Sequence, residues 1–262
     1  MNTGMSKWNT VARGYERSFA RLCGGAIPFL LEATTDAPGS RLLDAGSGTG
    51  ELAAYADRAG YSVVAVDASE GMVEIARQSH HGIRFDVGDL TALPHNDGAF
   101  DAVTANFVIN HTPDPRESLR EMHRVLATGG IAAATIWPYR VSTLNALWSE
   151  VLKRSGAVKP AIERLPSERD FERTTDGLAN LLIDTGFCSV TAHEIDFIFS
   201  IEPAELWAGV EAGIAIIGET FVAQNAEMRK RMADSFCTLA DASISGGYLH
   251  FPSAAVLAVG RR

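Results

Sequence analysis

Residues 42–50 of the chain read Leu42-Leu43-Asp44-Ala45-Gly46-Ser47-Gly48-Thr49-Gly50. This run is typical of a short apolar strand that ends in an acid and continues into a loop with glycine at alternate positions, followed by a helix from Glu51. Glycine lets the backbone turn tightly and lets a ligand contact main-chain N–H groups. The run therefore predicts a nucleotide-type ligand at the carboxyl end of the first strand of an open α/β sheet.

Two acids beside the loop narrow the choice of nucleotide. In a dinucleotide-binding G-x-G-x-x-G loop, the third glycine would stand where this chain has Glu51. A carboxylate in the first helical turn would repel a pyrophosphate, and Asp44 adds a second negative charge. A phosphate-binding P-loop is excluded, because no Gly-Lys-Ser/Thr follows. The loop favours a ligand that has cationic character and no phosphates.

Further acids follow the next two expected strands. The apolar stretch 61–66 ends at Asp67, 21 residues after Gly46, where an acid accepts hydrogen bonds from ribose hydroxyls. Asp89 follows the short strand 83–87 and is a candidate acceptor for an adenine amino group. These positions indicate an adenosine-containing ligand.

The chain resembles the class I S-adenosylmethionine-dependent methyltransferases, in the group with ubiquinone/menaquinone-type and natural-product enzymes. The resemblance covers roughly residues 7 to 137, about half of the chain, and implies S-adenosylmethionine as cofactor, no metal, and methyl transfer as the reaction. The matching stretches keep the family's order and spacing: Asp44 to Gly50, Val66 to Ser69 with Met72, Gly88 to Leu90 with Leu93-Pro94, Phe100 to Val103 leading to Asn106, and Arg124 to Leu126 before Gly129-Gly130.

The expected cofactor site combines the glycine loop, the strand-end acids and one tyrosine. Asp44 is expected near the amino group of the methionine part, with a structural turn acid as the alternative. Tyr15 resembles the tyrosine that closes over the cofactor in relatives, and Met72 is expected on the adenine or ribose; ordinary core packing is the alternative for both. The predicted cofactor-binding residues are Tyr15, Asp44, Gly46, Ser47, Gly48, Gly50, Asp67, Ala68, Met72, Asp89, Leu90, Asn106 and Phe107.

Candidate catalytic residues directly follow the fourth expected strand. Methyl transfer needs an aligned acceptor, and a dedicated base is optional. Asn110-His111 falls beside the donor, and the pKa of an ordinary histidine lies near neutrality, so His111 is a candidate base or acceptor-orienting group. Packing on the cofactor, or capping a turn before Pro113, is the alternative for His111. The predicted acceptor pocket consists of Trp8, Trp137, Tyr139, Trp207 and Ile214.

Composition limits the partners. The formal net charge is -9, which argues against nucleic acid as the main partner. Cys23, Cys188 and Cys237 show neither a disulfide nor a metal-binding spacing. No apolar run approaches the roughly 20 residues of a membrane span, and no signal-peptide core is evident. We expect a cytoplasmic protein, a monomer or homodimer, with a small hydrophobic acceptor and without nucleic-acid or membrane partners.

The pattern of elements predicts an α/β fold. Strands are expected at 41–44, 62–66, 83–87, 100–105 and 130–137, and helices at 50–60, 70–79 and 115–127, after a helical region at 5–33 that Gly24-Gly25 and Pro28 interrupt. This alternation indicates a mostly parallel sheet with helices on both faces.

Beyond Trp137-Pro138 the regular alternation of strands and helices ends. A helix at 142–156, a loop or lid at 159–170, a helix at 174–186, a strand at 190–200, a mostly helical segment at 203–243 and a last strand at 254–259 are expected. The complete prediction is a Rossmann-like seven-stranded, mostly parallel sheet with one antiparallel edge strand and a helical cap. Its parts are a helical lid (1–36), a cofactor-binding core (37–137) and a C-terminal part of the sheet with cap helices (138–262), integrated in one domain.

Two other functions fit parts of the pattern. A methyltransferase-like fold that binds the cofactor but catalyses another reaction such as cyclisation, or only binds, keeps the same motifs, because fold does not fix function. An NAD(P)-dependent oxidoreductase is disfavoured by Asp44, by Glu51 and by the missing third glycine. No motif distinguishes O-, N- or C-methylation.

Overall fold

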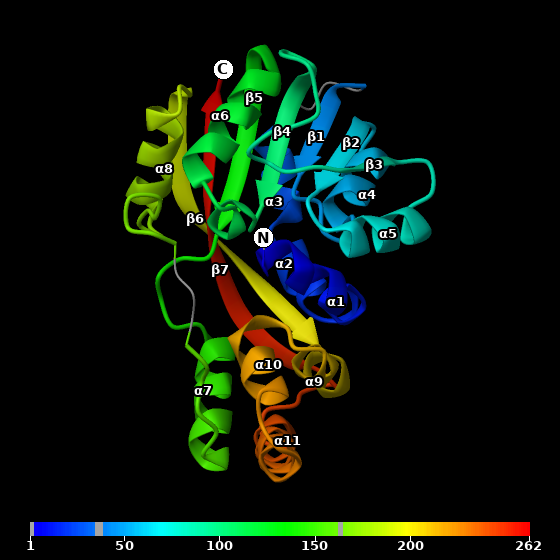
Figure 1. Cartoon of the computed structure of the whole chain (residues 1–262), viewed down its shortest axis with the longest axis vertical. Coiled ribbons are helices and arrows are strands. Elements are labelled where there is room, and N and C mark those ends of the chain that lie inside the picture. The colour runs from blue at the N-terminus through cyan, green and yellow to red at the C-terminus, as the bar shows by residue number, and fades with distance from the viewer. Residues whose placement is uncertain (1–2, 35–38, 162–164) are drawn as a thin grey trace.

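The computed structural model describes residues 3–34, 39–161 and 165–262. Its centre is a seven-stranded sheet in the order β3-β2-β1-β4-β5-β7-β6 (Figure 1). Strands β1 to β5 are parallel, and β7 runs antiparallel to both β5 and the edge strand β6. The predicted Rossmann-like fold is confirmed. The strands are β1 (Arg41–Ala45), β2 (Ser62–Asp67), β3 (Arg84–Val87), β4 (Phe100–Asn106), β5 (Leu126–Ile136), β6 (Cys188–Ile201) and β7 (Leu249–Arg261).

The order of the strands positions a ligand site. The chain passes from β1 outward to β2 and β3 and then returns to β4, on the other side of β1. In open α/β sheets a crevice forms at such a reversal, outside the carboxyl ends of the strands. The glycine loop follows β1 at this place, so the fold brings the decisive stretch of sequence to the expected ligand edge.

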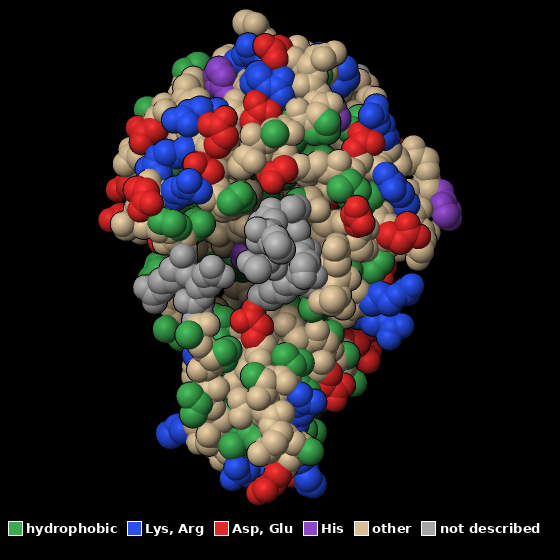
Figure 2. Space-filling view, in the orientation of Figure 1, with side chains coloured by type: hydrophobic (Ala, Val, Ile, Leu, Met, Phe, Trp, Pro, Cys, Tyr) green, Lys and Arg blue, Asp and Glu red, His purple; other side chains and the backbone are tan. Residues whose placement is uncertain are grey.

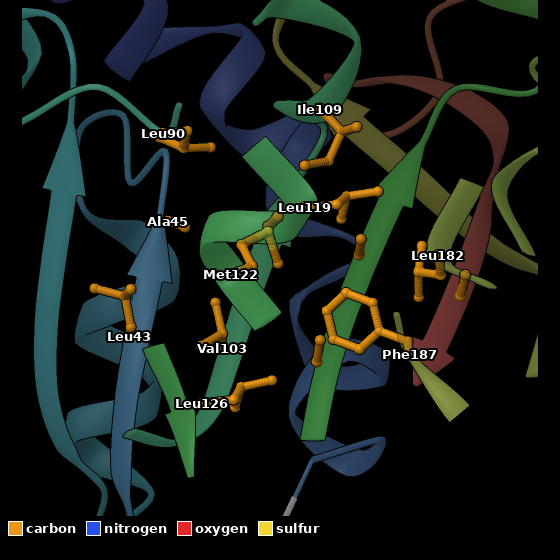
Figure 3. Packing of buried hydrophobic residues seen from close by; sticks show 14 of the residues in the cluster. Leu43, Ala45, Leu90, Val103, Ile109, Leu119, Met122, Leu126, Leu182 and Phe187 are labelled. Atoms are coloured by element: carbon orange, nitrogen blue, oxygen red, sulfur yellow. The ribbon is translucent and has the colours of Figure 1, made fainter. Parts of the chain in front are cut away.

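Helices cover both faces of the sheet (Figure 1). α3 (Ile27–Glu32) and α4 (Glu51–Arg58) pack on one face, and α6 (Pro115–Val125) and α8 (Thr175–Asp184) pack on the other. α5 (Glu70–Ser79) packs against β2 and β3. Figure 3 shows Leu119 and Met122 of α6 directed toward Leu43 and Val103 of the sheet, all four of them buried. Both faces are therefore apolar, as expected for a covered parallel sheet.

A second hydrophobic cluster supports the cap. α7 (Thr143–Ser155), α9 (Pro203–Glu211), α10 (Ala215–Val222) and α11 (Ala226–Asp241) lie below the sheet in Figure 1, around the extended ends of β6 and β7. Trp148 of α7, Leu206 of α9 and Phe236 of α11 are buried there against Phe199 and Phe251 of the two strands. The long β6–β7 pair thus joins the cap to the sheet.

The N-terminal region is helical, as expected, and residues 3–34 form one helix of 15 residues followed by two of six. They are α1 (Thr3–Arg17), α2 (Phe19–Gly24) and α3. The expected break at Gly24-Gly25 is present, and a further break falls at Ser18, whose hydroxyl donates to the carbonyl oxygen of Gly14 at 2.7 Å. Pro28 interrupts nothing, because it lies in the first turn of α3, where a missing N–H is tolerated.

Other differences from the expected boundaries follow from distant contacts. β5 begins at Leu126 because Leu126 pairs with Phe100 ahead of an irregularity in the β4–β5 register. β6 and β7 are longer than expected because they pair as far as Ile201 and Leu249. Residues 203–243 contain three helices, with a break at Gly213, whose φ is +87°. Residues 162–164 of the expected loop or lid, and 1–2 and 35–38 near the expected N-terminal lid, lie outside the described residues.

Candidate functional site

The glycine loop adopts the tight turn that its sequence predicts. Gly46, Gly48 and Gly50 have φ of +81°, +54° and +94°, in the left-handed region that favours glycine. A Cβ atom on Gly46 would lie 2.4 Å from a methyl carbon of Val108, so a side chain there would displace the segment after β4. The amides of Gly46 and Ser47 donate to the carbonyl oxygen of Val66. These bonds fix the loop against β2.

Asp67 joins the end of β2 to the glycine loop. Its carboxylate accepts hydrogen bonds from the amide of Gly48 at 2.9 Å and from the amide of Ser69 at 2.8 Å. Burial raises the pKa of Asp67, and the two amides oppose that increase. The structure therefore brings the expected ribose acid to the loop.

Asp44 is the most unusual group in the site. It is 1% exposed, and neither carboxylate oxygen has a hydrogen-bond partner of ordinary geometry. Burial, with the nearby charges of Asp67 and Glu51, raises the pKa of Asp44 to about 8, which the Ala53 backbone and the Thr104 hydroxyl only partly oppose. The adjacent Ser47 hydroxyl is likewise buried without a partner. Unpaired buried acceptors are costly, so they indicate that a ligand completes them.

These unpaired groups fit S-adenosylmethionine. A buried carboxylate suits a ligand ammonium group, and a second acid at the next strand end suits ribose hydroxyls. Asp44, Ser47 and Asp67 would therefore hold its methionyl and ribose parts. The fit rests on the unpaired oxygens of Asp44, and it agrees with a loop sequence that has Glu51 in place of a third glycine and no Gly-Lys-Ser/Thr.

The N-terminal helices cover the loop. The Tyr15 ring of α1 lies 3.6 Å from the position of a Cβ on Gly48. Burial raises the pKa values of the Tyr15 hydroxyl and of the neighbouring Cys23 thiol, that of Cys23 to about 12. The cavity that remains measures about 30 Å³, and Tyr15, Cys23, Asp44 and Asn106 are among its lining residues.

The side chain of Asn106 links α2 to the sheet by hydrogen bonds. Its amide nitrogen donates to the carbonyl oxygen of Cys23 at 3.0 Å, and its side-chain oxygen accepts from the Thr135 hydroxyl at 2.7 Å. The backbone amide of Phe107 donates to the same hydroxyl at 3.1 Å. β4, β5 and α2 are therefore connected by one network beside the cavity.

Glu51 and Cys23 are residues of this site that the sequence did not assign to it. Glu51 lines the cavity and accepts a hydrogen bond from the Thr49 hydroxyl at 2.6 Å. Burial raises the pKa of Glu51. Its position after Gly50 was a usable signal, whereas nothing local marks Cys23, which reaches the cavity through the docking of α2.

The segment after β4 carries the candidate catalytic pair. Asn110 and His111 lie in the short 3-10 helix η1 (Ile109–His111). The His111 ring is edge-on to the Trp8 indole with centroids 5.8 Å apart, and Trp8 makes the same kind of contact with Tyr15. The Asn110 side-chain oxygen is buried without a hydrogen-bond partner. Trp8 of α1 thus lies in contact with both Tyr15 of the same helix and His111 of η1.

The remaining predicted cofactor residues have mixed surroundings. Met72 is buried in a cluster with Trp8 and Tyr15, between α5 and α1. Asp89 accepts hydrogen bonds from the amide and hydroxyl of Thr91 at 2.9 and 2.8 Å. Ala68 is half-buried beside Asp67, Leu90 is part of the main core, and Phe107 is buried.

The predicted acceptor residues do not form one pocket. The Tyr139 side chain is 81% exposed. Trp207 stacks on Phe236 inside the cap, with centroids 4.9 Å apart, and donates to Glu211 at 3.1 Å. Ile214 is buried close to Gly14 of α1. Of this set, the structure places only Trp8 against Tyr15 and His111, and it places Trp137 against Phe107.

Surface charge, metal ligands and membrane-spanning helices bear on the partners of the protein. Figure 2 shows Lys and Arg side chains interspersed with Asp and Glu over the visible face. Within residues 3–34, 39–161 and 165–262, no three or more His, Cys, Asp or Glu side chains group as metal ligands. Among the same residues, no helix is both long and apolar enough to cross a membrane.

The proteins that resemble this chain in sequence include methyltransferases. A family model described as a methyltransferase domain matches residues 43–134. A demethylmenaquinone methyltransferase of Renibacterium salmoninarum is 31% identical over 198 residues, which are 72% of this chain and 80% of that protein. A malonyl-[acyl-carrier protein] O-methyltransferase of Pectobacterium atrosepticum is 33% identical over 138 residues, 52% of this chain and 54% of that protein. For other demethylmenaquinone methyltransferases the match spans about half of their length.

Solved structures share the fold at low sequence identity. A putative methyltransferase from Bacillus halodurans has a TM-score of 0.55 and 16% identity, covering 90% of this chain and 97% of that one. The cyclase SpnF has a TM-score of 0.53 and 21% identity, covering 91% of this chain and 80% of that one. At these identities the similarity concerns the fold alone.

The family follows from the agreement of these findings. The glycine loop, the unpaired Asp44 and the strand-end Asp67 are compatible with a cationic nucleoside, and the match to the relative from Renibacterium covers most of the chain. The chain belongs to the class I S-adenosylmethionine-dependent methyltransferases, in the group that includes the quinone methyltransferases.

Proposed function

We propose that the chain transfers the methyl group of S-adenosylmethionine to a hydrophobic small molecule, a quinone-like metabolite or another natural product. The observation that carries the cofactor assignment is the buried, unpaired Asp44 carboxylate beside the glycine loop. The acceptor class is supported by the demethylmenaquinone methyltransferases among the relatives and by the apolar cap. We expect the enzyme to be cytoplasmic, as a monomer or homodimer.

The chain's own residues would contribute binding, orientation and exclusion of water. S-Adenosylmethionine supplies an electrophilic methyl group when bound. Asp44 would pair with the amino group of the cofactor, Asp67 would accept the ribose hydroxyls, and Asp89 would accept the adenine amino group. The aromatic contacts of Trp8 with Tyr15 and His111 would keep water away from the reacting atoms.

Each part of the chain would have its own task. Residues 1–36 would act as the lid, 37–137 as the cofactor-binding core, and 138–262 as the cap that contacts the acceptor. Tyr139, Trp207 and Ile214 would reach the acceptor only after rearrangement, because Tyr139 faces solvent and the other two pack within the protein. We assign the first contacts with the acceptor to Trp8, Asn110, His111 and Trp137.

Two measurements on the purified protein test the proposal. Calorimetry with S-adenosylmethionine and S-adenosylhomocysteine tests the cofactor, and absence of binding to both would sink it. Mass spectrometry of reactions with demethylated quinones tests the acceptor, and the expected product is heavier by one methyl group replacing a hydrogen. A cofactor-dependent product of unchanged mass would instead identify a rearrangement or cyclisation.

A further inference from the structure

Helix α1 is attached to the cofactor-binding core through the side chain of Asn9. The Asn9 oxygen Oδ1 accepts two hydrogen bonds, from the Ser69 hydroxyl at 2.7 Å and from the Gly71 amide at 2.9 Å. Both donors belong to the start of α5. One side-chain atom of α1 therefore holds the first turn of a helix of the core.

This contact completes the N-terminal cap of α5. The first amides of a helix have no partner within the helix, and a capping side chain satisfies only some of them. Ser69 is the N-cap residue, and its hydroxyl accepts from the Met72 amide at 3.2 Å. Asn9 accepts from the Gly71 amide, which Ser69 does not reach. The cap is thus divided between α5 itself and α1.

Gly71 makes the close approach possible. A Cβ atom at position 71 would lie 2.8 Å from the Cα atom and 2.8 Å from the carbonyl oxygen of Asn9. Real side chains do not tolerate such distances to backbone, so any residue other than glycine would push α1 away from α5. The backbone of α1 can rest on α5 only because this position is a glycine.

The attachment point connects directly to the expected ribose acid. Ser69 donates its hydroxyl to Asn9 and its amide to the Asp67 carboxylate at 2.8 Å. The neighbouring Trp8 contacts His111, and Tyr15 of the same helix lies over Gly48. Asn9 therefore fixes the position of α1, the helix that carries Trp8 and Tyr15.

We propose that Asn9 is a positioning residue that latches α1 over the cofactor, and that breaking this latch limits how fast the cofactor enters and leaves. The proposal rests on the proposed function, because it takes the glycine loop as the cofactor site. The cavity that the N-terminal helices cover is about 30 Å³, and α1 contributes Tyr15 to its lining, whereas ligand pockets commonly have about 300–1,000 Å³. A nucleoside the size of S-adenosylmethionine needs more room than this, and movement of α1 would take Tyr15 out of the cavity.

The test is the rate at which S-adenosylhomocysteine leaves the protein, measured by stopped-flow displacement. Asn9→Ala removes the accepting oxygen, and we expect dissociation about tenfold faster, because two hydrogen bonds oppose opening. Asn9→Asp keeps oxygens that can accept from both donors, and its charge suits a helix N-terminus, so it should restore the wild-type rate. Arg13→Ala, at an exposed position of α1, is the matched control and should leave the rate unchanged.

The outcomes separate the latch from the proposed function. A wild-type protein that does not bind S-adenosylhomocysteine would defeat the proposed function and the latch with it. A wild-type protein that binds it, with Asn9→Ala releasing it at the wild-type rate, would defeat the latch alone. Equally fast release from Asn9→Ala and Asn9→Asp would also reject the hydrogen-bond account.

A second variant keeps the proposal testable if Asn9→Ala is poorly folded. Gly71→Ala places a methyl group against the Asn9 backbone and should likewise accelerate release about tenfold. Hydrogen exchange in Gly71→Ala should be faster than in wild type within α1, and unchanged within β1 and β4. Wild-type release and exchange in Gly71→Ala would contradict the proposal.

Discussion

The phenyl ring of Phe107 lies nearly parallel to the indole of Trp137, with ring centroids 3.8 Å apart and an angle of 9° between the planes. Phe107 has a φ of +54°, in the left-handed region that side chains rarely adopt. Its amide is held by the carbonyl oxygen and the hydroxyl of Thr135, both at 3.1 Å. The stacking and these two bonds hold the chain in a strained turn beside the site.

The Phe107–Trp137 stack should contribute strongly to stability. We expect Trp137→Ala to lower the free energy of unfolding by about 3 kcal/mol, because a large aromatic contact is lost and space is left in its place. Trp137→Phe keeps a ring over Phe107 and should lose less than half of that. Denaturant unfolding monitored by circular dichroism measures both values, and equal losses would show that stacking is not the cause.

The stability of the cofactor-free protein should depend on the charge of Asp44. Burial raises the pKa of Asp44 to about 8 in the folded protein, whereas an unfolded aspartate loses its proton near pH 4. Between about pH 4 and pH 8 the folded protein keeps a proton on Asp44 that the unfolded chain has lost. The contribution of protonated Asp44 to the free energy of unfolding is therefore complete below about pH 4 and is lost as the pH rises toward 8. Melting temperatures of wild type and Asp44→Asn across pH 5 to 9 should converge at low pH and favour Asp44→Asn at high pH.

The same titration should govern cofactor binding. If Asp44 binds the ligand ammonium group as a carboxylate, binding releases the proton that Asp44 holds below about pH 8. Affinity for S-adenosylhomocysteine should then rise with pH up to this value, by at most about tenfold per pH unit. Calorimetry at pH 7 in buffers of different ionisation enthalpy measures the proton released, and Asp44→Asn should release none from this position.

Asp67 should matter more for binding than for folding. Asp67→Asn removes the charge that strengthens hydrogen bonds to ribose hydroxyls, and we expect the dissociation constant of S-adenosylhomocysteine to rise about 100-fold. The melting temperature should fall by a few degrees, because an amide satisfies the Gly48 and Ser69 donors less well than a carboxylate. Glu70→Gln, an exposed neighbouring acid, is the control. An unchanged dissociation constant for Asp67→Asn would refute the ribose assignment.

Asn106 and Thr135 should act as one unit. Each of the variants Asn106→Ala and Thr135→Val breaks the 2.7 Å hydrogen bond between the two side chains, and each should cost about 1–2 kcal/mol of stability. The double variant should cost about 1 kcal/mol less than the sum of the single costs, since the bond can be lost only once. Urea unfolding of the four proteins gives the coupling, and strict additivity would argue against a shared network.

His111 should act through packing more than through proton transfer. Its ring is edge-on to Trp8 and its side chain is exposed, so His111→Phe should retain most of the activity. A general base usually contributes about 100-fold or more to the rate. We therefore expect kcat to fall less than tenfold in His111→Phe and further in His111→Ala; a 100-fold loss in both would make His111 the base.

The core of the site was predictable because its signals are local. The glycines at 46, 48 and 50 specify a turn by their own backbone freedom, and the period of apolar residues places Asp44 and Asp67 at strand ends. Consecutive parallel strands present their carboxyl ends at one edge, so these acids converge without further information. The mostly parallel sheet follows from the alternation of strands and helices.

The sequence predicted an N-terminal lid with Tyr15, but not the contacts that attach it, because these join distant segments. Asn9 and Cys23 acquire their roles only when α1 and α2 dock on α5 and β4, and nothing in their own neighbourhood indicates this. The packing of the predicted acceptor residues likewise depends on distant segments. Trp207 stacks on Phe236 of α11, a contact that its own stretch of sequence does not indicate.

The β6–β7 pair makes the cap exchangeable in principle. Residues 202–248, which contain α9 to α11, form an insertion between the paired ends Ile201 and Leu249. A homologous segment with the same end-to-end spacing could replace this insertion without changing the register of the sheet or the cofactor loop. A replacement would have to keep the close contacts of Gly209 with Ser18 and of Ala212 with Gly14. If the cap contacts the acceptor as proposed, recombination at Ile201 and Leu249 would alter acceptor preference.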